Sequence, residues 1–297
     1  EMAIMIFSKG REVSFDPGYY NTHYRFGWTN QTISHLTVTV NERSQLAVDA
    51  PGGSLNLSVA RDGLSMVDAS DEGAYRSEAI DMYRRAVALI DVSDKDSYII
   101  DIFRVDGGHT RDYSFHAQGT GFKVEGLNLS EPEKKGSLAS PDYEWGTKLR
   151  GDYQIIGQER MGFYWTPPGE GYGFLSGAQR ASGEDTWSAT WSIYDATSQN
   201  TRLRMTMLGA PGREIIVADG PKPMGVKYTL ARDKGEVPSQ YVALIEPVEG
   251  KFLVDAFESL DIEGGLSPVA AKVVLNPEAT ASKSRTWDMR SLLGLGS

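Results

Sequence analysis

Two histidines lie in short alternating segments, where an imidazole could bind a metal ion or transfer a proton. His35 lies in the segment 34–40, and His116 ends the segment 112–116. In each segment the apolar residues have the opposite parity to the histidine. On β-strands both imidazoles would therefore share the polar face with threonine, serine and aspartate side chains. Neutral imidazole is a common zinc ligand, and its titration near neutral pH also suits proton transfer.

An acidic segment, 67–75, offers the carboxylate that a metal site with two histidines requires. Its carboxylates are Asp68, Asp71 and Glu72, any one of which could be the ligand. Zinc bound by His35, His116 and one of these carboxylates would keep one position open for water or substrate. The spacings between these residues match no metal-binding motif, so histidines that are hydrogen-bonded on half-exposed strands are the alternative interpretation.

Three further side chains could act on a substrate. Tyr75 follows the acidic segment and could transfer a proton if a nearby cation lowers its pKa from about 10. Its alternative role is aromatic packing at the start of a strand. Arg84 and Arg104 could bind a carboxylate or sulfate through two hydrogen bonds each. Arginines on strands also pair with neighbouring aspartates, here Asp81 or Asp101.

The composition of the 297-residue chain excludes several classes of function. With 30 Lys and Arg against 40 Asp and Glu, the formal net charge is −10, which argues against general binding to nucleic acid or to an anionic membrane. No apolar run reaches the roughly 18 residues of a transmembrane helix. Because the chain has no cysteine, thiolate metal sites, cysteine nucleophiles and disulfides are excluded.

The elements that must position these side chains have the composition of β-strands. Short segments rich in β-branched and aromatic residues, bounded by turn residues, occur at 38–40, 85–92, 98–105, 113–116, 187–194, 201–208, 214–218, 241–246 and 251–256. Gly107 and Gly108 predict a hairpin connection. No sustained helical periodicity is present. We therefore predict an all-β fold, a large antiparallel sandwich of two sheets.

The sandwich divides into two parts on the basis of composition. Residues 1–126 form the first part and carry the candidate metal site, and residues 149–276 form the second part. Between them, 127–148 is rich in charged residues, proline and glycine and is predicted to be an exposed connection. Residues 277–297 are predicted to be a terminal edge strand followed by a tail.

Several of these segments follow one another in an order typical of a known family. They are 10–19, Trp28, 34–40 with Gln45, 68–75, 83–85, 101–108, 112–116, 228–232 and 241–247. This order resembles the C-terminal β-sandwich region of the heparinase II/III-like polysaccharide lyases, which include oligoalginate lyases. The resemblance covers most of residues 1–260.

The resemblance implies an enzyme in which an N-terminal helical toroid, absent from this chain, precedes the sandwich. Such an enzyme cleaves a heparin-like, heparan-like or alginate-like glycan by β-elimination, often with bound zinc. By position, His35, Asp68 and His116 would be the metal ligands, with Asp71 as the alternative to Asp68, and Tyr75 would be the tyrosine near the cleft. Elimination needs a positive group to neutralise the uronate carboxylate, a base for the C5 proton and an acid for the leaving oxygen. The resemblance also implies a bacterial periplasmic or secreted protein.

We therefore expect the sandwich domain of a polysaccharide lyase, with zinc, an acidic polysaccharide and a helical toroid as its partners. Arg84 and Arg104 would contact the substrate. A non-catalytic carbohydrate-binding or scaffold module is the alternative, which Ile33 and Leu36 permit, since family members have histidine and asparagine at these positions. A glycoside hydrolase is a third reading, but it needs two facing carboxylates, and no pair is singled out.

Overall fold

The computed structural model of the chain describes residues 2–14, 16–18, 25–45, 52–142, 169–193, 200–221, 224–262 and 269–279. Their strands are β1 (Phe7–Ser8), β2 (Arg11–Glu12), β3 (Val38–Val40), β4 (Ser54–Arg61), β5 (Leu64–Ser70), β6 (Met82–Asp91), β7 (Ser97–Asp106), β8 (Thr110–Glu125), β9 (Ser176–Ser182), β10 (Trp187–Ile193), β11 (Thr201–Met207), β12 (Glu214–Asp219), β13 (Val226–Lys234), β14 (Ser239–Glu249), β15 (Val254–Ser259) and β16 (Ala271–Leu275). The helical elements are short: η1 (Arg25–Thr29), η2 (Thr32–Ser34), η3 (Glu72–Glu78) and η4 (Tyr172–Phe174). The predicted all-β class is confirmed.

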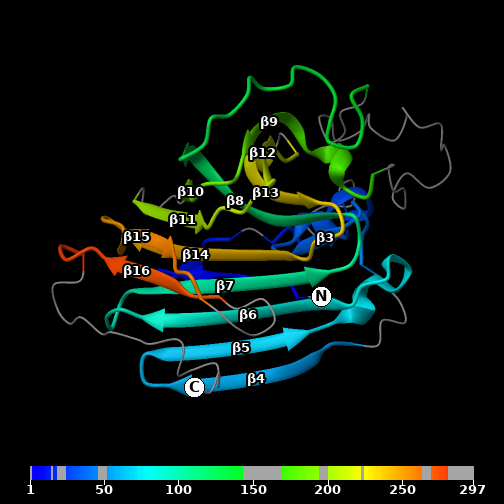
Figure 1. Cartoon of the computed structure of the whole chain (residues 1–297). Coiled ribbons are helices and arrows are strands. Elements are labelled where there is room, and N and C mark those ends of the chain that lie inside the picture. Colours follow the sequence, from blue (N-terminus) through cyan, green and yellow to red (C-terminus); the bar gives the residue numbers. More distant parts are fainter. Residues whose placement is uncertain are drawn as a thin grey trace.

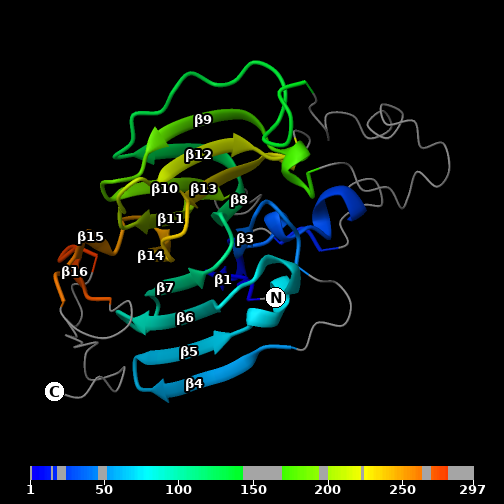
Figure 2. The same cartoon turned by 45° about the vertical axis from the view of Figure 1, so that its right-hand side comes forward.

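One long antiparallel sheet forms most of the structure. Its strand order is β4-β5-β6-β7-β14-β11-β10-β8-β13-β12-β9, and β3 pairs with β8 beside this path. Figures 1 and 2 show β4 at one end of the sheet and β9 at the other. The sheet curves back on itself, so that its two halves pack face to face as a sandwich. Among the described residues, no helix is long and apolar enough to cross a membrane.

Strand β8 belongs to both halves of the sandwich. Its first part pairs with β3 and β13, and its second part, from Gly119, pairs with β10. The change of partner coincides with a break in register between Ser192 and Ile193 on β10. A single continuous strand therefore fixes the position of one half relative to the other.

The predicted hairpin at Gly107 and Gly108 is wrong. These residues do join β7 to β8, and both have positive φ values, 104° and 67°. However, β7 pairs with β6 and β14, whereas β8 pairs with β3, β10 and β13. The two glycines therefore carry the chain from one half of the sandwich to the other, which the turn signal alone could not distinguish from a hairpin.

The main core lies between the two halves of the sheet. Phe115 of β8 contacts Trp191 of β10 with ring centroids 5.3 Å apart, and Tyr113 lies 5.5 Å from Tyr241 of β14. Trp191 is fully buried, and its indole N–H donates to the carbonyl of Lys227 at 2.9 Å. The alternating apolar residues of β8 therefore face this core, and the polar residues of opposite parity face away from it.

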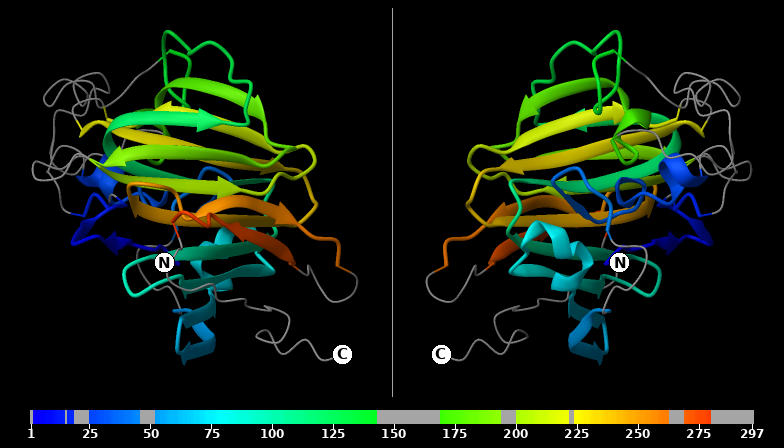
Figure 3. Two further views of the ribbon diagram at one scale, coloured as in Figure 1. Left: turned by 90° about the vertical axis from the view of Figure 1, so that its left-hand side faces the viewer. Right: turned by 90° about the vertical axis from the view of Figure 1, so that its right-hand side faces the viewer.

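The two outer faces of the sandwich are covered by different elements. On the half formed by β8, β13 and β12, residues of η1, η2 and η4 pack over a second apolar cluster that includes Trp28, Ile33 and Tyr172. On the half formed by β5, β6, β7 and β14, the hairpin of β15 and β16 covers a third cluster, which includes Phe257 (Figure 3).

Residues 127–140 of the predicted connection lie along the edge strand β9. The amide of Ser130 donates to the carbonyl of Arg180 at 2.9 Å, and the amide of Glu133 donates to the carbonyl of Ala178 at 3.0 Å. This segment therefore satisfies backbone groups of an edge that would otherwise be open for pairing. Residues 143–148 and the predicted tail beyond 279 lie outside the described residues.

Candidate functional site

The two histidines come from different kinds of backbone. His116 lies on β8 opposite Tyr228 of β13, and its parity places it on the outer face of this half. Contrary to the prediction, His35 is not on a strand: it follows η2, its amide donates to the carbonyl of Thr32 at 3.1 Å, and its carbonyl accepts from the amide of Thr37 at 2.9 Å. Both histidines lie near enough to Asp16 for their charges to lower its pKa.

Asp16 holds His35 in place. Its carboxylate lies 3.0 Å from Nδ1 of His35, whose side chain is 28% exposed. Its other oxygen accepts a hydrogen bond from the amide of Gly18 at 2.9 Å. The hydrogen bond from His35 lowers the pKa of Asp16, and the charges of His35 and His116 lower it further. Burial acts in the opposite direction, but the net effect is a lowered pKa. Asp16 is therefore the carboxylate of this site, and it leaves Nε2 of His35 for a ligand.

His116 is completely buried, so the alternative interpretation, a hydrogen-bonded histidine on a half-exposed strand, does not describe it. Its ring stacks on Tyr228 with centroids 4.3 Å apart and an interplanar angle of 26°. The hydroxyl of Tyr228 in turn accepts a hydrogen bond from the indole of Trp28 at 3.1 Å. Burial raises the pKa of Tyr228 well above its usual value, so this hydroxyl stays protonated. The imidazole is thus fixed between β8, β13 and η1.

Asp68 is placed elsewhere, which corrects the predicted ligand set. Arg84 donates two hydrogen bonds to its carboxylate, at 2.7 and 2.9 Å, and Asn56 donates a third at 3.0 Å. The alternative, Asp71, is buried just before η3. In the described ranges no three His, Asp or Glu side chains are grouped as a metal would require. Asp68 therefore neutralises an arginine rather than joining the histidines.

Tyr75, predicted to transfer a proton, is buried in the sandwich core. Its side chain is 2% exposed, and its hydroxyl donates to the carbonyl of Val38 at 3.1 Å. Its ring packs edge-on against Tyr83, 5.4 Å away. Burial raises the pKa of Tyr75 well above 10, the opposite of what an acid–base tyrosine needs. The aromatic-packing alternative describes this residue.

Arg84 and Arg104 lie opposite each other on β6 and β7. Their face is not that of the histidines. Arg85, the next residue, points into the core, where it pairs with Asp101 at 2.6 Å and donates to the carbonyl of Leu36. Successive strand residues point to opposite faces, so Arg84 and Arg104 lie on the outer face of the other half. The structure therefore separates the predicted substrate-binding arginines from the candidate histidine site.

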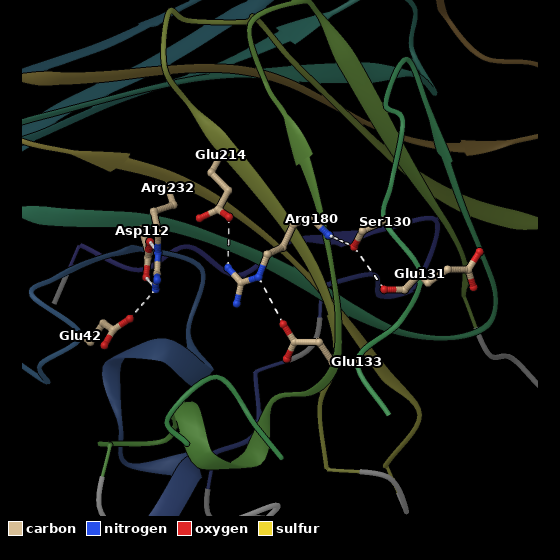
Figure 4. Close-up of polar contacts among 8 residues, drawn as sticks. All are labelled: Glu42, Asp112, Ser130, Glu131, Glu133, Arg180, Glu214 and Arg232. Carbon is tan, nitrogen blue, oxygen red and sulfur yellow. Dashed lines mark hydrogen bonds and ion pairs between the residues drawn. The ribbon is translucent and has the colours of Figure 1, made fainter. Parts of the chain in front are cut away.

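A buried ionic network centres on Asp112 of β8, two residues before Ser114 and on the same face as His116. Arg232 donates to both oxygens of Asp112, at 2.7 and 2.6 Å, and to Glu42 at 2.7 Å (Figure 4). Tyr172 of η4 donates to Asp112 at 2.6 Å. This network ties η4 and the segment after β3 to the sheet and so supports the cover over the site.

Sequence reasoning missed Asp16, Trp28 and Tyr228 as members of the site. Asp16 precedes Pro17-Gly18, which is typical of a turn, and its bond to the Gly18 amide is such a turn. Only the pairing of β8 with β13 shows that Tyr228 faces His116. Of the other histidines, His109 is exposed, 3.8 Å from Glu236, as expected for a loop, and His23 lies outside the described residues.

Comparisons with known proteins were made for the sequence and for the fold. Residues 1–223 match the family described as heparinase II/III-like, C-terminal. No curated protein sequence matches the chain.

Among solved structures, a heparinase III gene product superposes with a TM-score of 0.56 and 12% identity over 92% of this chain. A second heparinase III structure gives a TM-score of 0.50 and 13% identity, also over 92% of the chain. In both cases the match covers 34% of the other chain, so this chain spans about a third of those proteins. At such identities the similarity shows the fold alone.

Proposed function

Because this chain belongs to the heparinase II/III-like C-terminal family, we propose that it is the β-sandwich domain of a polysaccharide lyase acting on a uronate-containing glycan by β-elimination. The observation that carries the proposal is the grouping of Asp16 with two histidines: His35 binds its carboxylate at 3.0 Å, and the charge of the buried His116 also acts on it. A histidine fixed by a carboxylate at one nitrogen presents its other nitrogen in a defined direction. Such an arrangement suits a site for an ion or an anionic substrate rather than a structural core.

Zinc is the metal that this donor set fits best. His35 and His116 supply two imidazoles, and Asp16 orients the first of them. When bound, zinc would supply positive charge opposite the uronate carboxylate and make the C5 proton more acidic. Asp16 replaces Asp68 as the carboxylate of this proposal, because Asp68 is held by Arg84.

The chain's own residues bind and orient rather than transfer the proton. His116 is held by its stack on Tyr228, and His35 by Asp16. Tyr75, the tyrosine that would have acted as an acid, is buried and keeps its proton. We therefore propose that the base and the acid of the elimination come from a helical toroid domain, and that the protein acts in the bacterial periplasm or outside the cell, where large acidic glycans occur.

Metal content tests the histidine site directly. We expect near-stoichiometric zinc in the purified chain by elemental mass spectrometry. The variants His35→Ala and Asp16→Asn should lose most of it. His109→Ala is the matched control, because His109 is exposed and lies in the connection that precedes β8. Zinc retained in His35→Ala, or absent from the parent, would contradict the site.

Lyase activity is tested in the chain joined to a helical toroid domain. We expect a polyuronide to give the ultraviolet absorbance of an unsaturated uronate. His35→Ala should lower that rate at least about tenfold, while His109→Ala leaves it unchanged. No absorbance from any heparan-like or alginate-like substrate would contradict the lyase proposal.

A non-catalytic glycan-binding module is the second candidate. The buried hydroxyl of Tyr75 favours it, because this residue cannot supply the acid. Ile33 and Leu36 are also fully packed core residues. Saturable glycan binding without any unsaturated product, in the presence of the toroid, would favour this module over the lyase.

A further inference from the structure

A cavity of about 530 Å³ opens at the end of the sandwich, away from the histidines. It lies where the connections after β11, β13 and β15 meet. Its charged lining residues are Arg111, Arg213, Lys234 and Asp233, three cations against one carboxylate. Its walls also include apolar side chains such as Leu208. In a chain with a net charge of −10, this local excess of positive charge is unusual.

Arg111 is a buried cation whose hydrogen bonds all go to neutral groups. The residue is 1% exposed. Its Nε donates to the hydroxyl of Ser239 at 2.9 Å, and its Nη atoms donate to the carbonyls of Gly108, Gly235 and Val237 at 2.7, 2.6 and 2.7 Å. Within the described part of the chain no carboxylate pairs with it. Its charge therefore remains available to a ligand through the field inside the cavity.

Arg213 pairs with Asp233, the only carboxylate among the described lining residues. Both its Nε and its Nη2 donate to Asp233 at 2.8 Å, and its guanidinium lies 4.4 Å from the ring centroid of Tyr241. Asp233 is also the residue opposite Arg111 in the pairing of β13 with β8. The carboxylate thus pairs with Arg213, while the hydrogen bonds of Arg111 go to neutral groups, and the exposed Lys234 adds a third positive charge. The site is built to favour an anion.

A row of polar residues leads from the cavity across the sheet. Gln240, which lines the cavity, lies opposite Arg104, and Arg104 lies opposite Arg84. Strands are about 4.8 Å apart, so Arg84 is about 10 Å from Gln240. Burial lowers the pKa of Arg104, and the neighbouring Arg84 lowers it further. Asp68 already pairs with Arg84 through two hydrogen bonds, so Arg104 is the cation of this row that a bound anion would stabilise.

We propose that this cavity and the adjoining Arg104 bind an acidic saccharide, with a carboxylate or sulfate in the cavity beside Lys234 and a further acidic group beside Arg104. The choice of a saccharide rests on the proposed function, whereas the preference for an anion rests on the lining alone. The apolar walls would contact the sugar ring. This site is distinct from the histidines, because Arg111 and His116 have opposite parity on β8 and point to opposite faces.

Calorimetric titration tests the proposal with three tetrasaccharides of different charge: one from heparan sulfate, one from alginate and a neutral maltotetraose. The His35→Ala background removes the histidine site from the measurement. We expect binding of an acidic tetrasaccharide that weakens as salt is added, and none of maltotetraose. Binding of the heparan probe alone identifies sulfate as the required group, and binding of both acidic probes identifies the carboxylate that they share.

Lys234→Gln should weaken binding about fivefold to tenfold, because one charge-assisted contact is lost. Lys123→Gln is the matched control, an exposed lysine on the far part of β8 that pairs with Glu125. Ala210→Phe, which fills the cavity, should abolish binding, with its fold checked by circular dichroism. Unchanged affinity in both cavity variants, equal binding of maltotetraose, or no binding of either acidic probe would overturn the proposal. Zinc content and lyase activity are separate readouts, so either proposal can fail alone.

Discussion

At the scale of single residues, the pair formed by Asp16 and His35 decides which imidazole nitrogen of the candidate site can bind a ligand. A carboxylate that accepts from Nδ1 fixes both the ring orientation and the tautomer, so Nε2 becomes the reactive nitrogen. Asp16 is itself fixed by the Gly18 amide. The site therefore depends on a turn that lies far from both histidines in the sequence.

Asp16→Asn tests this pair through the pH dependence of stability. The pKa of Asp16 is lowered in the fold, so its contribution is present above the unfolded value near 3.8 and is lost as the pH falls through the folded pKa. We expect the variant to lose about 1 kcal/mol at pH 7 and much less at pH 3, measured by urea unfolding. Asp94→Asn, at an exposed turn, is the control. An equal loss at both pH values would contradict this.

Arg232→Met tests the buried network beside the site. It leaves the carboxylate of Asp112, 1% exposed, without its main counter-charge, so we expect a loss of about 3–5 kcal/mol in the free energy of unfolding. Arg180→Met removes two ion pairs on the surface, with Glu133 and Glu214, and should cost less than about 1 kcal/mol (Figure 4). Similar losses in both variants would show that burial does not decide the difference.

At the scale of elements, the sequence predicts the strands better than their partners. Residues 38–40 are β3 as predicted, and the alternation of 113–116 correctly sets which side chains of β8 face the core. Alternation depends only on neighbouring residues. It cannot show that β7 and β8 lie in different halves, nor that Asp68 pairs with Arg84, because these facts depend on the pairing of distant strands.

The same limit explains the site residues. The outward direction of His116 follows from the alternation of β8, which the sequence carries. The burial of Tyr75 and the approach of Asp16 to His35 depend on how the segments before β3 and after β5 fold over the sheet. No local pattern in the chain reports such contacts.

Gly119 marks the point where β8 leaves one half of the sandwich for the other, and its substitution tests that role. A Cβ at Gly119 would lie 2.4 Å from the carbonyl oxygen of Ser192, a backbone atom that cannot easily move. We expect Gly119→Ala to lower the free energy of unfolding by about 2 kcal/mol. Gly121→Ala meets only the Ser192 hydroxyl, at 3.1 Å, and should cost less than about 1 kcal/mol. The reverse order, measured by denaturant unfolding, would contradict this account of the bend.

At the scale of the whole molecule, buried tyrosines link the fold to alkaline pH. Burial raises the pKa of Tyr83 and of Tyr98 to about 12, and that of Tyr75 well above 10. Their contribution to stability is complete below the unfolded pKa near 10 and is lost as the pH rises through the folded values. We expect ultraviolet titration to show delayed tyrosine ionisation, and unfolding to begin above about pH 10. Ionisation of all tyrosines near pH 10 without unfolding would contradict this.

The two halves of the molecule present different chemistry to a glycan. The half with β3, β8 and β13 holds the histidine site under short helical elements, and the other half holds the arginine row. The cavity lies at the end of the sandwich, with lining residues from both halves. If both proposals hold, an acidic chain can be retained on one face while it is processed at the other. Variants of the two sites should then be independent in binding and additive in free energy.

The position of β8 in both halves also has a consequence for how quickly the chain folds. Val38 and Tyr113 are more than 70 residues apart, and His116 and Tyr228 more than 100, whereas β4 to β7 join near neighbours. Distant pairs close slowly because a long loop must be ordered first. We expect the β4–β7 meander to refold early and the histidine site late, so that hydrogen-exchange protection of the His116 amide appears in the slowest kinetic phase. Newly made protein would then have its meander in place well before it can hold zinc.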